Sequence, residues 1–155
     1  MAHAFPINHP LRPTFRALGG LTGLYLTGFG VLGVLDTSGD EFFAQNDSTA
    51  LWQGTNLGYS VIAIVAGLIV LIGVAIGRNV DIAINKLFGY AFMALSLAAL
   101  AVERTDANYL NFTIPTVIVA MVVGLVLTTA AMYGKVGTDE DAKAARHATL
   151  FLESH

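Results

Sequence analysis

Apolar residues fall into four long runs, and charged residues stand almost only between them. Residues 17–35 carry no charge, and as a helix they would extend about 28 Å at roughly 1.5 Å per residue. That length spans a hydrocarbon core of about 30 Å. Residues 57–76, 87–102 and 112–132 form the other runs, none of which contains Asp, Glu, Lys, Arg or His. The pattern predicts an all-α polytopic membrane protein with four transmembrane helices.

The composition agrees with a chain embedded in lipid. Charged residues make up 12% of the 155 residues, where globular proteins carry about a quarter, and apolar residues reach 55%. The formal net charge of −3 excludes a nucleic-acid binder that relies on general basicity. Because the chain has no cysteine, disulfides, thiolate zinc sites and iron–sulfur clusters are excluded as well.

Lysine and arginine lie mostly on one side of the predicted spans. Seven of the eight precede the first span, lie between the second and third, or follow the fourth, and only Arg104 lies on the other side. This distribution predicts that both termini are cytoplasmic, in a protein of the plasma membrane. The expected parts are a cytoplasmic arm (1–16), a transmembrane domain (17–134) and a cytoplasmic tail (135–155). A capping box that starts at Thr138 predicts a short amphipathic helix in the tail.

The two halves of the chain resemble each other. Arg16-Ala-Leu-Gly19 before the first span matches Lys86-Leu-Phe-Gly89 before the third. Gly67-Leu68 in the second span likewise matches Gly124-Leu125 in the fourth. Both halves enter from the same side, so the pattern predicts two repeated hairpins in parallel orientation.

The loop after the first span, residues 36–56, combines acidic and aromatic side chains. Phe42, Phe43 and Trp52 stand there among four acidic residues. One interpretation is an aromatic belt at the headgroup level of the membrane. The other is a docking loop whose aromatics anchor on a partner protein. A calcium loop is disfavoured, because the regular ligand spacing and the bidentate glutamate at position twelve are missing.

Small residues recur at four-residue spacing, which allows membrane helices to approach closely. Gly19 and Gly23 begin such a face in the first span, and Gly30 adds to it. This span has more glycine than its own bundle needs. We therefore interpret part of the face as a docking surface for a helix of another chain.

Asn56 and Asn111 each stand where a loop enters a span. They either cap the helices or form a paired polar site at the outer face. The spans offer no general acid or base and no haem or metal ligand, so we predict no enzyme activity, no catalytic residue, no cofactor and no metal site. The histidines all lie in the terminal segments, at His3, His9, His147 and His155.

The glycine and asparagine placements resemble a known family. The residues that carry the resemblance are Leu18-Gly19-Gly20…Tyr25…Gly28-Phe29-Gly30…Leu32-Gly33, Asn56…Gly67 and Asn111…Gly124. They are similar to small four-helix membrane proteins of unknown function that are common in actinobacteria. The resemblance covers residues 16–135. A histidine often follows each asparagine in that family, whereas this chain has Asn56-Leu-Gly-Tyr59 and Asn111-Phe-Thr-Ile114, so a histidine-based role is not implied.

The layout is also similar to small accessory subunits of the actinobacterial respiratory supercomplex, which joins a cytochrome bc-type complex to a cytochrome aa3-type oxidase. This similarity implies a non-catalytic accessory or assembly subunit, with lipids and other membrane subunits as its partners. A small oligomeric transporter or channel is the alternative from another class. A lipid- or quinone-binding membrane protein is a further alternative.

Overall fold

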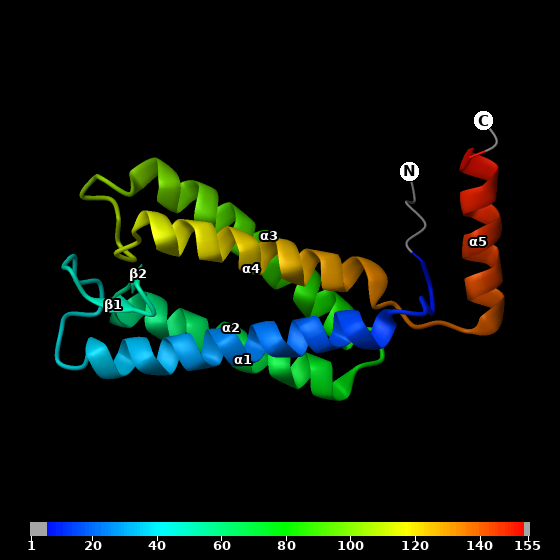
Figure 1. Cartoon of the computed structure of the whole chain (residues 1–155), viewed down its shortest axis with the longest axis horizontal. Helices are drawn as coiled ribbons and strands as arrows, with labels where there is room; N and C mark the ends of the chain where they lie inside the picture. Colours follow the sequence, from blue (N-terminus) through cyan, green and yellow to red (C-terminus); the bar gives the residue numbers. More distant parts are fainter. Residues whose placement is uncertain (1–5, 154–155) are drawn as a thin grey trace.

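Helices account for most of the computed structural model, which describes residues 6–153 (Figure 1). Each of the helices α1 to α4 is long and apolar enough to cross a membrane. The predicted all-α fold with four candidate membrane spans is therefore confirmed, and one short β-hairpin is added in the first loop. His3 and His155 lie outside the described residues. The elements in chain order are α1 (Arg12–Asp36), β1 (Thr49–Ala50), β2 (Gln53–Gly54), α2 (Leu57–Ile76), α3 (Val80–Val102), α4 (Ile114–Tyr133) and α5 (Asp139–Glu153).

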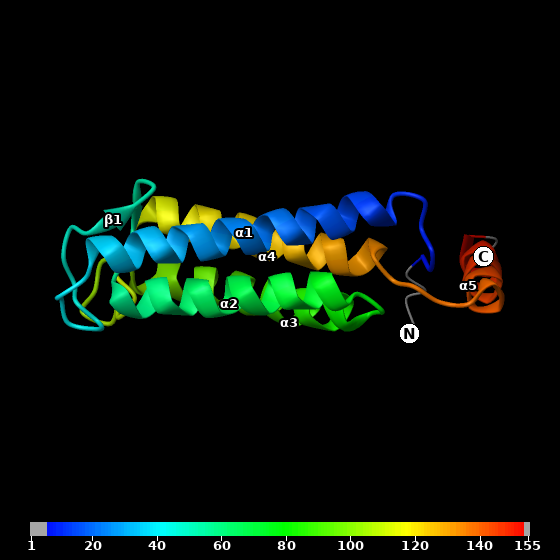
Figure 2. The ribbon, with the colours of Figure 1, turned by 90° about the horizontal axis from the view of Figure 1, so that it is seen from below.

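The four long helices run up and down in alternation, as Figures 1 and 2 show. α1 packs mainly on α2, and α3 packs mainly on α4. One end of the bundle, here called the terminal end, holds the start of α1, the α2–α3 turn and the end of α4. There the Asn8 backbone N–H donates to the Lys135 carbonyl oxygen at 2.9 Å. The opposite end, here called the loop end, holds the first loop (37–56) and the second loop (103–113).

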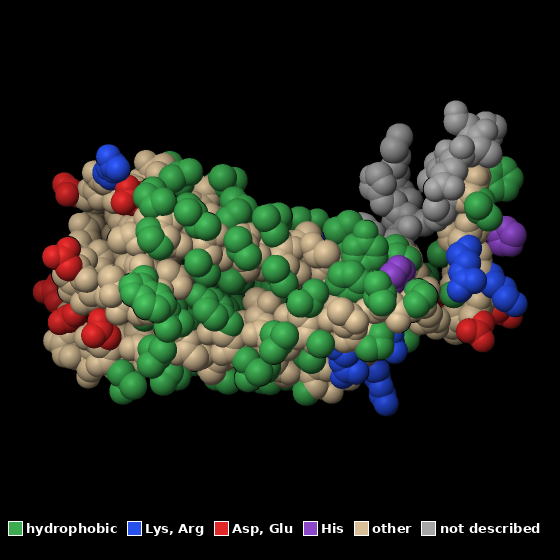
Figure 3. All heavy atoms as spheres, viewed as in Figure 1, with side chains coloured by type: hydrophobic (Ala, Val, Ile, Leu, Met, Phe, Trp, Pro, Cys, Tyr) green, Lys and Arg blue, Asp and Glu red, His purple; other side chains and the backbone are tan. Residues whose placement is uncertain are grey.

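Charge is divided between these two ends (Figure 3). Asp and Glu gather at the loop end, where Arg104 also lies. Lys and Arg gather at the terminal end and on α5, and α5 also carries Asp139, Glu140 and Asp141 in its first turn. Between the ends, the visible surface of the bundle is largely apolar. A polypeptide that crosses a bilayer needs this arrangement, because only its ends meet water and headgroups.

α2 coincides with its predicted span, and the other long helices differ at their starts. α1 begins at Arg12, before residue 17, and α4 begins at Ile114, after residue 112. The largest difference is in α3, which begins at Val80 and not at residue 87. Its additional turns contain Asp81, whose side chain is buried at 5% exposure. The run expected as the third span, residues 87–102, holds no charged side chain, but the helix extends beyond that run and includes this buried carboxyl group.

Glycine lets the two helices of each hairpin approach closely. A Cβ atom on Gly67 of α2 would lie 2.7 Å from the carbonyl oxygen of Gly23 in α1. A Cβ atom on Gly124 of α4 would lie 2.8 Å from the carbonyl oxygen of Gly89 in α3. Since no side chain fits at such distances, backbone meets backbone at both crossings, as is usual where small residues line membrane helices.

α5 lies at the terminal end, across the direction of the bundle helices (Figure 1). Its start is a capping box, in which Thr138 Oγ1 accepts from the Asp141 N–H and the Asp141 carboxylate accepts from the Thr138 N–H, both at 3.2 Å. The tail helix expected from the sequence is thus present. Near its end, Leu150 and Phe151 are exposed. This crosswise direction would lay α5 along a membrane surface.

Candidate functional site

Three aromatic side chains fill the bundle at its loop end. Phe29, Tyr59 and Phe112 are all buried. The Tyr59 ring meets the Phe29 ring edge-on, with 5.6 Å between centroids, and meets the Phe112 ring edge-on at 4.4 Å. Contacts of this kind contribute about 0.5–1.5 kcal/mol beyond the burial of area. These contacts join α1, α2 and the second loop, so the three rings form a packed aromatic cluster against which both loops lie.

Asn56 fastens the start of α2 to both loops. Its Oδ1 accepts a hydrogen bond from the Tyr59 N–H at 2.9 Å, which makes Asn56 the N-cap of α2. Its Nδ2 donates to the carbonyl oxygen of Ala44 in the first loop at 3.2 Å and to that of Tyr109 in the second loop at 2.7 Å. The Asn56 side chain is fully buried, and its two bonds to the loops are partly buried.

Asn111 connects the same loops in the opposite direction. Its Nδ2 donates to the carbonyl oxygens of Thr55, at 2.8 Å, and of Asn46, at 2.9 Å. Its Oδ1 accepts from the Asn46 N–H at 3.3 Å. Asn111 does not cap α4, because that role falls to Thr113 in a capping box with Thr116.

The two asparagines form a bridge between the loops. Among the hydrogen bonds of residues 6–153, none joins the Asn56 side chain to the Asn111 side chain, and the polar atoms of both are already used. Of the two roles expected from the sequence, capping applies to Asn56 alone. The bridge has a structural consequence, since it locks the two loops into one layer that closes the loop end.

A two-residue turn carries the most exposed aromatic side chain of the first loop. β1 and β2 pair antiparallel with Ala50 opposite Gln53, so Leu51 and Trp52 form the turn between them. Both have positive φ, at 48° and 63°. Such turns usually hold Asn-Gly, because positive φ costs other residues about 1–2 kcal/mol each. The turn leaves Trp52 87% exposed.

The base of this β-hairpin is clamped between two membrane helices. Gln53 Nε2 donates to Tyr25 Oη of α1 at 2.6 Å. The Gly54 N–H donates to Thr113 Oγ1 at 2.9 Å, and the Gly54 carbonyl oxygen accepts from Thr116 Oγ1 of α4 at 2.7 Å. The strained turn is therefore a fixed projection from the bundle.

Phe42 and Phe43 are the other aromatics predicted for docking. Their rings meet edge-on with 4.7 Å between centroids, and about half of each side chain is exposed. The Phe42 carbonyl oxygen accepts from the Gly58 N–H at 2.7 Å, which ties the pair to the first turn of α2. The pair thus lies partly against α2, while Trp52 stands clear of the bundle.

The three glycines predicted to face a partner are buried within the chain. A Cβ atom on Gly30 would lie 2.5 Å from the Ser60 carbonyl oxygen of α2, and Gly23 also lies against α2. A Cβ atom on Gly19 would lie 3.0 Å from Asn85 Nδ2 of α3. The close approach that these glycines allow is therefore used inside the bundle, mainly where α1 packs on α2.

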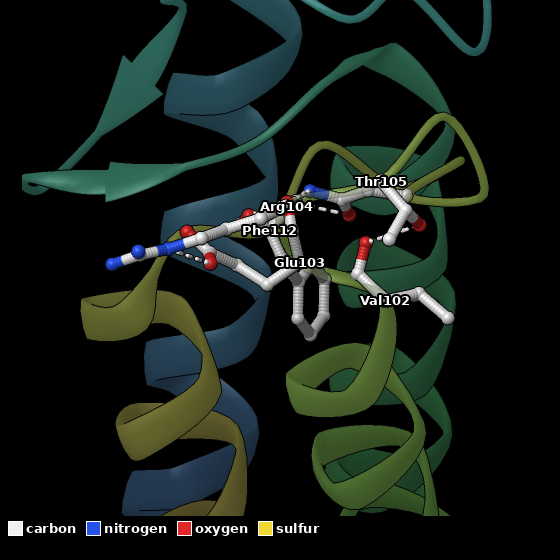
Figure 4. Close-up of polar contacts among 6 residues, drawn as sticks. Val102, Glu103, Arg104, Thr105 and Phe112 are labelled. Carbon is white, nitrogen blue, oxygen red and sulfur yellow. Dashed lines mark hydrogen bonds and ion pairs between the residues drawn. The ribbon is translucent and has the colours of Figure 1, made fainter.

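The second loop is shaped by Asn108. It also carries an exposed ion pair between Glu103 and Arg104 (Figure 4). Asn108 Nδ2 donates to the carbonyl oxygens of Glu103, at 3.0 Å, and Phe112, at 2.8 Å, and its Oδ1 accepts from the Phe112 N–H. Arg104 Nε lies 3.3 Å from Glu103 Oε2, and the Arg104 side chain is 89% exposed. An ion pair this exposed contributes little to stability, so the Asn108 bonds are what fix the loop.

Asp81 and Asn85 are buried residues of α3 that the sequence analysis did not single out. Asn85 is buried, and its Oδ1 is the one fully buried side-chain polar atom without a hydrogen-bond partner among residues 6–153. Both residues lie on the buried face of α3 that continues through Gly89 and Phe92. The spacing of three and four residues along this face was the available signal, but both residues lie before Lys86, where the uncharged run of the predicted span begins.

Relief of the backbone strain in the turn is expected to stabilise the protein. Leu51→Asn combined with Trp52→Gly supplies the residues that tolerate positive φ, and it should raise the free energy of unfolding by about 2 kcal/mol. The measurement is titration of the purified protein with SDS, followed by circular dichroism. Phe42→Asn combined with Phe43→Gly, outside the turn, is the control and should bring no gain. An equal gain in the free energy of unfolding for both double variants would contradict the presence of backbone strain in the turn.

The described part of the chain does not gather metal ligands, since residues 6–153 hold no group of three or more His, Cys, Asp or Glu side chains that could bind a metal ion. What the loop end presents is a tryptophan on a clamped hairpin. Comparison with known proteins adds no assignment, because no family model, no curated protein and no solved structure matches this chain.

Proposed function

We propose that this protein is a non-catalytic accessory subunit of a larger membrane complex and that the Leu51–Trp52 turn docks on a neighbouring subunit. The observation that carries the proposal is the positive φ of both turn residues, together with the 87% exposure of Trp52. A turn of Asn-Gly would form the same hairpin at lower cost. Backbone strain that persists although a cheaper sequence exists is typical of positions that serve a function.

The clamp at the base of the hairpin suits such a role. Because Gln53 is bonded to Tyr25 and Gly54 to Thr113 and Thr116, the turn loses little conformational freedom when a partner covers it. Tryptophan is also enriched among the residues that dominate interface energies. Leu51, 43% exposed, adds apolar area beside it.

The finer features of the proposal rest on the sequence. Seven of eight basic residues lie toward the terminal end. This distribution supports the proposal of cytoplasmic termini in the plasma membrane, with the turn on the opposite side. Similar packing of α1 on α2 and of α3 on α4 supports two repeated hairpins. The respiratory supercomplex of the bc–aa3 type is the proposed host, and its support is the resemblance in size, span number and lack of charged chemistry.

The test is a native pull-down in digitonin with Trp52→Ala and Tyr109→Ala as a matched pair. Both residues are exposed aromatics of the loop end, but only Trp52 lies in the strained turn. The wild-type protein is expected to retain oxidase and cytochrome bc subunits, identified by mass spectrometry and by haem bands in a reduced-minus-oxidised spectrum. Trp52→Ala should lower their recovery at least about tenfold, and Tyr109→Ala should leave it unchanged.

Two results would overturn the proposal. A colourless eluate that contains this chain alone would remove the accessory role. If Trp52→Ala and Tyr109→Ala lowered the recovery of these subunits equally, Trp52 would belong to an aromatic belt at the headgroup level. In such a belt, exposed aromatic residues at the same depth are equivalent.

A lipid- or quinone-binding role is the second candidate, and one groove favours it. The groove has about 420 Å³, lies between α1 and α4 and is almost entirely apolar. Thr22 and Tyr25 are its polar members, and Tyr25 Oη already accepts a bond from Gln53. Quinone retained by the purified wild-type protein and lost on Tyr25→Phe would support this role, and its absence from the wild-type protein would contradict it.

A further inference from the structure

We propose that a groove beside α1 at the terminal end binds one anionic phospholipid, with its phosphate at Arg12 and Arg16. The groove has about 540 Å³ and is formed mainly by α1, with Val74 contributed by α2. This volume falls within the roughly 300–1,000 Å³ of small-molecule sites. From the two arginines toward the loop end, the groove is lined by Gly20, Leu21 and Leu24, which are apolar or lack a side chain.

Arg16 is held in place at the part of the groove nearest the terminal end. Its Nε donates to the Val74 carbonyl oxygen at 3.0 Å, and its Nη2 donates to the same oxygen. The guanidinium therefore reaches across from α1 to the last turn of α2 instead of extending into water. An arginine has five N–H donors in a fixed fork, so donors remain for a phosphate after this carbonyl is satisfied.

Arg12 supplies a second, uncommitted cation. No hydrogen bond or ion pair of its guanidinium occurs within residues 6–153. It is the first residue of α1, and that helix has no acidic residue in its first turn and no side-chain cap. Two cations near the positive end of a helix dipole repel that end electrostatically. A bound anion is attracted both by the cations and by the helix N-terminus, so it removes this unfavourable interaction.

The dimensions of the groove point to a lipid and not to a small anion. From Arg12 to Leu24 the axis of α1 rises about 18 Å at roughly 1.5 Å per residue. One leaflet of a bilayer is about 15 Å deep, half of the hydrocarbon core. A phosphate with an attached acyl chain matches both the cationic end and the apolar length, whereas a free phosphate would leave the apolar part unfilled.

The charge half of the proposal is tested with Arg12→Gln and a matched control. Arg78→Gln removes the same charge from the same end of the bundle, but Arg78 is exposed and does not line the groove. Native mass spectrometry of the delipidated protein, titrated with phosphatidylglycerol or phosphatidylcholine, measures the affinity. We expect one phosphatidylglycerol to bind in preference to phosphatidylcholine. Arg12→Gln should weaken that binding about fivefold, and Arg78→Gln should not.

The apolar half is tested by filling the groove without a change of charge. A Cβ atom on Gly20 has only Val74 within 4 Å, at 3.7 Å, so Gly20→Leu fits the helix and occupies the groove. Gly28→Leu is the control on the same helix, since a Cβ atom there has nothing within 4 Å. Gly20→Leu should abolish the preference for phosphatidylglycerol, and Gly28→Leu should preserve it.

Three results would overturn the proposal. Equal losses with Arg12→Gln and Arg78→Gln would mean that the general charge of this end attracts the lipid. Unchanged binding with Gly20→Leu would mean that only a headgroup or a free phosphate is bound. Equal binding of phosphatidylglycerol and phosphatidylcholine by the wild-type protein would leave the two arginines without the proposed role.

Discussion

Gly30→Ala is expected to lower the free energy of unfolding by about 3 kcal/mol, whereas Gly28→Ala should not lower it. A Cβ atom on Gly30 would lie 2.5 Å from the Ser60 carbonyl oxygen and 2.8 Å from the Ile64 backbone nitrogen, both in α2. Backbone atoms cannot rotate away as a side chain does, so α1 and α2 must separate. A Cβ atom on Gly28 meets nothing within 4 Å, and alanine is the better helix former by up to about 1 kcal/mol.

The measurement is the SDS midpoint and slope of unfolding for both variants beside the wild-type protein. The two glycines are on the same helix and differ only in what faces them, so the comparison isolates the helix crossing. Equal midpoints for Gly30→Ala and Gly28→Ala would contradict the backbone contact between α1 and α2.

Asn56→Ala should be the most damaging of the single changes considered, with a loss of about 4 kcal/mol. The substitution removes the cap from the Tyr59 N–H and leaves the Ala44 and Tyr109 carbonyl oxygens without their donor. Both loop bonds are partly buried, so the loss of each costs about 1–1.5 kcal/mol. The loss of the N-cap is part of this total.

Asn56→Asp separates the two parts of this effect. Aspartate keeps an oxygen that caps α2, but it cannot donate to the two carbonyl oxygens of the loops. The same SDS titration should therefore give a loss between those of wild type and Asn56→Ala. Asp47→Ala, at an exposed position of the first loop that takes no part in the bridge, is the control and should cost less than about 1 kcal/mol. A loss for Asn56→Ala no larger than this control would contradict the bridge between the loops.

Hydropathy alone was enough to predict the four membrane helices, because the partition of an apolar run into lipid depends on that run and not on distant residues. The prediction for α3 was less accurate. The apolar run begins after the exposed Lys86, whereas Asp81 and Asn85 before it face the inside of the bundle and the helix continues through them. A buried polar side chain looks like a loop residue when only hydropathy is considered.

The contacts of the candidate site could not be predicted in the same way. The spacing of Gly19, Gly23 and Gly30 correctly indicated a close approach of helices, but nothing in the spacing says which helix approaches. Leu51 and Trp52 have no turn signature, since both usually avoid positive φ. Their conformation is imposed by the clamp on Gln53 and Gly54, whose partners lie far away in the sequence.

The bridge also makes the first loop depend on residues that are synthesised later. The partners of Asn56 and Gly54 include Tyr109, Thr113 and Thr116, all from the second half of the chain. A chain emerges from the ribosome with its N-terminal part first, so α1 and α2 can pair while their connecting loop still lacks these partners.

The Leu51–Trp52 turn is consequently among the last parts of the molecule to reach its final form. The bond from Gln53 to Tyr25 of α1 can form early, but the Gly54 part of the clamp forms only after α4 has brought Thr116 to Gly54. A neighbouring subunit that docks on Trp52, as proposed, would therefore select completed chains over those that are still being synthesised.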